Sequence, residues 1–191
     1  MTPSRVFIPS IDARFGYISA APKHKNFSLL NYSTREKYNQ LHSIVPTGPT
    51  SERRDILDHS LVVKVIRVDG RHGTYPDCTW KVDFGSGSMY NRGRRVQHDH
   101  RNHLHWATLE ATLEALKTIK DICKVNRGVT KIVVVTQSQV LYSILGWQKN
   151  VHDELVAAGC PHNMKRAYSE LQSLISSVET HGRRVQFWYR P

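Results

Sequence analysis

The carboxylate of Asp69 stands where a strand-like run gives way to a glycine. The run at 61–68 is mostly β-branched, and Gly70 follows Asp69 directly. Mg²⁺ prefers oxygen ligands and usually takes one or two carboxylates from the protein beside substrate phosphates, so Asp69 is a candidate metal ligand. An Asp-Gly pair is equally typical of a simple turn, and both interpretations stay open.

Basic side chains gather in NRGRRVQHDHRNHLH, residues 91–105. Arginine neutralises the backbone phosphates of nucleic acids without reading the base sequence. The predicted phosphate contacts are Arg92, Arg94, Arg95 and Arg101. The competing interpretation of this segment is a solvated basic loop.

Histidines of the same segment offer nitrogen ligands to a transition metal. Neutral imidazole suits Zn²⁺, and four candidates lie close together in the sequence: His98, His100, His103 and His105. In extended backbone, alternate residues such as His103 and His105 would face the same way. Histidines clustered in a loop more often bind no metal, so zinc is a secondary hypothesis.

Three aromatic residues are candidates for stacking on bases or on a protein partner: Trp147, Trp188 and Tyr189. Neighbouring residues on a strand point to opposite faces. We therefore expect Trp188 in the core and Tyr189 exposed.

The elements that would position these residues follow from the hydrophobic pattern. Strands are predicted at 61–68, 78–84, within 85–97, at 132–135 and at 183–191, and helices at 105–124, 140–147 and 167–178, with a variable stretch between Trp147 and Pro161. Three consecutive strands before the first helix predict an antiparallel meander joined to parallel strands by helical crossovers, which is an α/β architecture. Residues 1–58 have no sustained period but many large apolar groups, which indicates an N-terminal extension that is partly packed.

The composition limits the function further. With 27 Lys and Arg against 16 Asp and Glu in 191 residues, the net charge is +11 and the pI about 9.8, which favours a polyanionic partner such as nucleic acid. The three cysteines form no C-x-x-C pair, as expected in a reducing compartment. We expect an intracellular, soluble protein without membrane attachment; nucleus, cytoplasm and mitochondrion are not distinguished.

Four strings around the long helix resemble the ribonuclease H family, particularly its fungal members. They are WKVDFGSGSMYN at 80–91, KIVVVTQSQVL at 131–141, PHNMKRAYSELQSLI at 161–175 and VQFWYRP at 185–191. The resemblance covers about residues 60–191. It implies a ribonuclease H-like domain at 59–191 that lacks the family's final helix, with a mixed five-stranded sheet of three antiparallel and then parallel strands, flanked by helices.

The family cleaves the RNA strand of RNA/DNA hybrids with two Mg²⁺ ions held by four carboxylates. Carried over, the first carboxylate matches Asp69. The second lies in the first turn of the long helix, where the apolar stripe favours His105; a shifted register would offer Glu110 but would bury Glu114. The third becomes the uncharged Gln137 of Thr-Gln-Ser, and the fourth would lie beyond the last residue of the sequence.

One carboxylate of four cannot hold two repelling divalent ions. We therefore expect a vestigial site at Asp69, His105 and Gln137 and a catalytically degenerate protein, without cofactor, that binds RNA or an RNA/DNA hybrid or acts as a scaffold. Two alternatives stay open. One is a weak Mg²⁺-dependent ribonuclease H that uses Glu110, and the other is a module for protein interaction or homodimer formation.

Overall fold

The computed structural model describes residues 5–7, 60–72, 75–85, 88–96, 103–160 and 164–191. Side chains at 60, 69–72, 75–77 and 103 lie outside this description. Most of the predicted extension, residues 8–58, also lies outside it. Within the described part of the chain, no helix has both the length and the apolar character of a membrane span.

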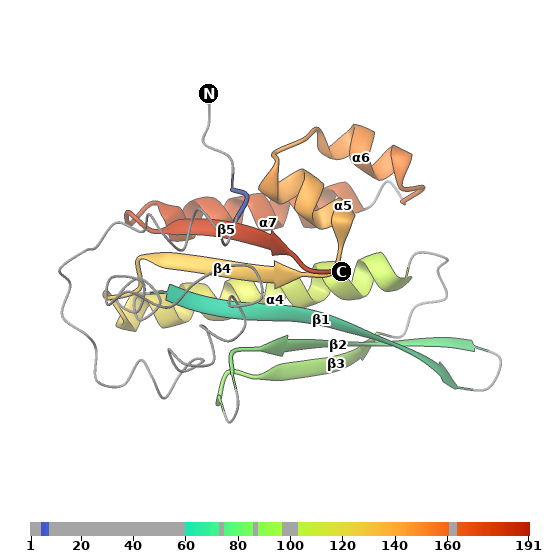
Figure 1. Cartoon of the computed structure of the whole chain (residues 1–191), viewed down its shortest axis with the longest axis horizontal. Coiled ribbons are helices and arrows are strands. Elements are labelled where there is room, and N and C mark those ends of the chain that lie inside the picture. Colours follow the sequence, from blue (N-terminus) through green and yellow to red (C-terminus); the bar gives the residue numbers. More distant parts are fainter. Residues whose placement is uncertain (1–4, 8–59, 73–74, 86–87, 97–102, 161–163) are drawn as a thin grey trace, which may run out of the picture.

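Five strands form one mixed sheet in the order β3-β2-β1-β4-β5 (Figure 1). They are β1 (Ser60–His72), β2 (Tyr75–Asp83), β3 (Arg92–Val96), β4 (Lys131–Thr136) and β5 (Arg184–Tyr189). The pairs β1–β2 and β2–β3 are antiparallel, whereas β1–β4 and β4–β5 are parallel. This order and these directions confirm the predicted ribonuclease H-like α/β fold.

The helices lie on one face of the sheet and beyond its β5 edge (Figure 1). They are α4 (His103–Val125), α5 (Gln139–Leu141), a π-helical turn η1 (Tyr142–Gly146), α6 (Val151–Ala157) and α7 (Met164–Glu179). The pattern had predicted no element where α6 lies. Asn150 begins that helix by accepting hydrogen bonds from the amides of His152 and Asp153, and this N-cap was the local signal for it.

Alternation along the strands divides the core into two parts. Leu61, Val63 and Val65 of β1 belong to the main core, which packs under α4 and α7. Val62 instead belongs to a smaller cluster on the opposite face, together with Phe7, Val133, Val135 and Trp188. The β4 run is apolar and β-branched throughout because both of its faces are buried.

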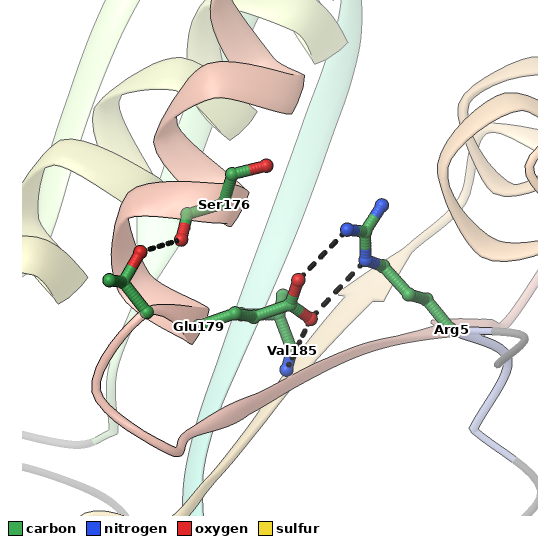
Figure 2. Close-up of polar contacts among 5 residues, drawn as sticks. Arg5, Ser176, Glu179 and Val185 are labelled. Carbon is green, nitrogen blue, oxygen red and sulfur yellow. Dashed lines mark hydrogen bonds and ion pairs between the residues drawn. The ribbon is translucent and has the colours of Figure 1, made fainter. Parts of the chain in front are cut away.

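Residues 5–7 extend the sheet beyond β5. The amide of Phe187 donates to the Arg5 carbonyl at 2.7 Å, and the amide of Phe7 donates to the Phe187 carbonyl at 2.8 Å. Figure 2 shows the Arg5 guanidinium on the Glu179 carboxylate, with Nη2–Oε2 at 2.8 Å and Nε–Oε1 at 3.2 Å. Oε1 of Glu179 also accepts from the Val185 amide at 3.3 Å. Glu179 therefore holds the end of α7, the start of β5 and the N-terminal segment together.

We predict that Arg5→Gln weakens this docking by about 1–2 kcal/mol, because it leaves a carboxylate that is only 25% exposed without its bidentate partner. The readout is native-state amide hydrogen exchange, which should quicken at Phe7 and Phe187. Arg184→Gln removes the same charge from an exposed position on β5 and is the matched control. Equal exchange in both variants would contradict the prediction.

Candidate nucleic-acid interface

A polar turn positions β3 relative to β2. The Asp83 carboxylate accepts from the Gly85 amide at 2.8 Å, and Gly85 has a φ of 121°, which favours glycine. The Asn91 side chain accepts from the Phe84 amide and donates to the Gly85 carbonyl, both at 2.8 Å. These hydrogen bonds therefore determine where β3, with its arginines, starts relative to the end of β2.

The arginines predicted to contact phosphate form most of β3. Arg92, Arg94 and Arg95 are all exposed. In the register, Arg94 lies opposite Trp80 and Arg92 opposite Val82, both of which belong to the main core, so these two arginines point to the α4 side. Arg95 points to the other side. Arg101 lies outside the described residues.

Arg92 and Arg94 line a groove between β3 and α4. Its volume is about 460 Å³, and its other walls come from Trp80, Gly93, Glu110, Leu113, Glu114 and Lys117. A side chain at Gly93 would approach the Trp80 carbonyl to 3.2 Å, so glycine suits the close packing of β3 on β2 there. The groove thus has closely packed β2 and β3 on one side and α4 on the other.

The carboxylates in the groove are engaged on its helical side. Glu110 accepts from Trp80 Nε1 at 3.0 Å. Glu114 lies 3.8 Å from the Lys117 ammonium, which also lies 3.4 Å from Glu170. Within the described part of the chain, no carboxylate forms an ion pair with Arg92 or Arg94. Arg92 and Arg94, called the β3 lip below, therefore form the positive side of the groove.

A row of side chains connects this lip to the start of α4. Arg67, Trp80 and Arg94 are register neighbours across β1, β2 and β3. His105 lies in the first turn of α4, as predicted, and is half-buried. Burial and, to a lesser extent, the positive charge of Arg67 lower the pKa of His105. A neutral imidazole beside a guanidinium therefore stands where the resemblance implies a carboxylate.

The tip of β4 leads directly into α5. The Thr136 hydroxyl accepts from the Ser138 amide at 3.1 Å, and Ser138 caps α5 by accepting from the Leu141 amide at 3.2 Å. Gln137 lies between these two buried residues and is exposed. Thr136 and Ser138 thus form the strand-to-helix turn, and Gln137 presents an uncharged amide at the tip.

Strand register does not bring Asp69 level with that tip. Thr136 of β4 lies opposite Val65 of β1, and Asp69 lies four residues further along, opposite Cys78 of β2. At about 3.3 Å per residue, Asp69 is about 13 Å beyond the level of Thr136 and about 10 Å beyond that of Gln137. On the α4 side of β1, the charged residue closest to the level of Gln137 is instead Arg67, two positions beyond Val65.

The described residues do not fit a pair of Mg²⁺ ions. Such a pair needs several anionic oxygens close together. The positions where the resemblance implies the second and third carboxylates hold the His105 imidazole and the Gln137 amide. Arg67 lies beside His105, and the Glu110 carboxylate is bound to Trp80. No group of three His, Cys, Asp or Glu side chains among the described residues is arranged to hold a metal.

The histidine cluster is divided by the start of α4. His98 and His100 lie outside the described residues, as does the side chain of His103. The backbone at 103 and 105 is helical, so the strand geometry assumed for His103 and His105 does not hold. Zinc binding by the cluster stays a prediction.

Aromatic side chains lie beside the β4 tip. Trp188 is buried and Tyr189 is partly exposed, in agreement with the alternation argument. Tyr189 lies opposite Thr136, and its ring centroid is 5.7 Å from that of Tyr142. Trp147, which follows η1, is 54% exposed. Stacking surfaces are therefore available near the uncharged tip.

Arg67, Lys117 and Tyr142 lie beside the candidate interface but were not predicted from the sequence. A sequence signal for Arg67 existed, because a charged residue late in the apolar run of β1 is expected near the end of the strand, where it can reach solvent. Lys117 and Tyr142 had none, because their positions depend on how α4 and the π-helical turn pack.

The lowered pKa of His105 predicts a pH effect on stability. The unfolded histidine, with a pKa near 6.5, takes up a proton before the folded one does, so acid favours unfolding at this position. Between about pH 7.5 and about pH 5.5, His105→Gln should therefore lose less free energy of unfolding than the unsubstituted protein. Urea denaturation measures this, with His152→Gln as an exposed control. An equal or larger loss in His105→Gln would refute it.

Comparison with known protein sequences assigns no family to this chain. No protein-family model and no curated protein sequence matches the chain. Among solved structures, the chain is similar to RNase H1 from the halophilic archaeon Halobacterium salinarum NRC-1, with 15% sequence identity and a TM-score of 0.39 over 68% of this chain and 82% of that one. The strand order and directions, rather than this likeness, identify the fold as ribonuclease H-like.

Proposed function

We propose that this protein is a catalytically degenerate ribonuclease H-like protein of the fungal type that binds RNA or an RNA/DNA hybrid. The observation that carries the proposal is the exposed edge strand β3, whose arginines form the positive lip of the groove beside α4. This face would recognise the shape and backbone of the nucleic acid rather than its base sequence.

The spacing of Arg92 and Arg94 suits a phosphate backbone. Residues two apart on a strand lie about 7 Å apart, which is on the scale of the distance between neighbouring phosphates of one nucleic-acid strand. Arg92 is held in place because its Nη1 donates to the carbonyls of Met89 and Asn91, at 2.9 and 3.0 Å. Donors that are fixed before binding lose less side-chain entropy when phosphate arrives. The lip is therefore suited to non-specific backbone contacts.

Loss of catalysis in this proposal follows from charge. Where a two-metal site concentrates negative charge, this chain places Arg67, neutral His105 and uncharged Gln137. A guanidinium at this position repels divalent cations and attracts phosphate. The same residues that oppose metal binding thus support binding of the substrate-like polyanion.

Aromatic residues offer a second type of contact in the same proposal. Unpaired bases stack on exposed aromatic rings in single-stranded RNA recognition, with about 1–3 kcal/mol per base. Trp147 and the adjoining Tyr142 and Tyr189 lie beside the β4 tip. We expect them to favour a ligand with an unpaired end or bulge.

Binding should depend on the β3 arginines. The double variant Arg92→Gln with Arg94→Gln should weaken binding of an RNA/DNA hybrid and reduce the slope of log affinity against log salt by about 1–2, because roughly one counterion is released per phosphate contact. Gel-shift titration over a range of salt concentrations measures both quantities. Lys165→Gln with Arg166→Gln on α7 removes the same charge and is the control. Failure of the unsubstituted protein to retain hybrid at low salt would refute the proposal.

Cleavage distinguishes this proposal from the weak ribonuclease H alternative. With a labelled hybrid and Mg²⁺ or Mn²⁺, we expect no cleavage above the protein-free control, and no change on Asp69→Asn or Glu110→Gln. Cleavage that either substitution abolishes would show an enzyme instead. Light scattering during size-exclusion chromatography tests the homodimer alternative on the same preparation.

A further inference from the structure

A second basic cavity lies where α4 and α7 end, at the opposite end of α4 from His105. From His105 to Cys123 along α4 is about 27 Å at 1.5 Å per residue, so the two regions are separate. The cavity has a volume of about 300 Å³. Its lining is Lys120, Cys123, Lys124, Arg127, Ser177, Val178, His181 and Arg183.

The lining is strongly cationic. Five of these eight residues are basic, counting His181, and none is acidic. Lys124 forms an ion pair with Asp121 at 2.7 Å. Lys120, Arg127 and His181 form no ion pair with any of the described residues. The surrounding carboxylates therefore leave most of this positive charge uncompensated.

Arg183 is fixed in the wall of the cavity. Its Nη2 donates to the Cys123 carbonyl at 2.8 Å and its Nε to the Val129 carbonyl at 3.2 Å. These bonds use two of its five N–H donors and hold the guanidinium plane across the end of α4. The remaining N–H donors of Arg183 are therefore already held in place before a ligand binds. A preorganised guanidinium is well suited to an anion with several oxygens.

Stabilisation of helix ends accounts for only part of this charge. The C-termini of α4 and α7 each carry roughly half a negative charge, which favours nearby cations. Two such ends are equivalent to about one negative charge, and Asp121 supplies another. Lys120, Lys124, Arg127 and Arg183 together carry four positive charges, so about two remain uncompensated even with His181 neutral.

We propose that this cavity is a binding site for a phosphate or diphosphate group. Phosphate oxygens match the convergent Lys and Arg donors, and the volume is at the lower end of the range for small-ligand sites. The group belongs either to a small phosphorylated molecule or to the backbone of a nucleic acid that extends past α4. The proposal does not depend on the function assigned to β3.

Inorganic pyrophosphate tests the site directly. Titration calorimetry on the full chain at low salt should detect binding, and Lys120→Gln with Arg127→Gln should weaken it about tenfold or more through loss of two charge-assisted contacts. Both side chains are at least partly exposed, and neither forms an ion pair with a described residue, so this variant should stay folded. Arg183 is left in place because it also binds two main-chain carbonyls. Lys165→Gln with Arg166→Gln is the charge-matched control.

Absence of pyrophosphate binding, or equal binding by the cavity variant and its control, would overturn the proposal. Hybrid binding by the cavity variant identifies the source of the phosphate. If hybrid affinity falls together with pyrophosphate affinity, the cavity contacts a nucleic-acid backbone; if only pyrophosphate affinity falls, its ligand is a small phosphorylated molecule. Arg92→Gln with Arg94→Gln should leave pyrophosphate binding unchanged. The proposals for the cavity and for the β3 lip can therefore be refuted independently of each other.

Discussion

Burial of β4 on both faces is the constraint on which the other elements depend. Its apolar run can be covered only if β1 and β5 flank it, α4 and α7 close one face, and Phe7 with Trp188 closes the other. The parallel pairing of β4 with β1 then fixes the level of every residue along β1 relative to the strand tip. That register places Arg67 rather than Asp69 near Gln137, so the chemistry of the tip follows from the packing of the core.

Electrostatic character is distributed over two regions of the long helix α4. At its start, a half-buried neutral imidazole lies beside Arg67, and the β3 lip faces the turns of α4 that follow. At its end, Arg183 and its neighbours surround the second cavity. Carboxylates concentrate between these regions, where Glu110 and Glu114 are engaged by Trp80 and Lys117. The high net charge of the chain is therefore arranged on separate surfaces rather than spread evenly.

Periodicity was sufficient to predict the strands, the long helix and their order, because burial of one or both faces selects the residue type at each position. It was sufficient for His105 as well, since the apolar stripe of α4 determines which residue falls in the first turn. The distance between Asp69 and Gln137 could not be predicted, because parallel register depends on side-chain packing between strands 60 residues apart. The short helix α6 was missed because seven residues give little periodic signal, and only its Asn150 cap indicated it.

The N-terminal residues that extend the sheet have a consequence for self-association. Arg5–Phe7 occupy the outer edge of β5, so that edge cannot accept a strand from another copy without first releasing them. Among the described strands, β3 is the other edge, and two copies aligned there would place rows of arginines against one another. Edge charges of this kind oppose aggregation through β-pairing. A polyanion lying along β3 would remove that repulsion, so a ligand of the proposed kind would also expose this edge to pairing between copies.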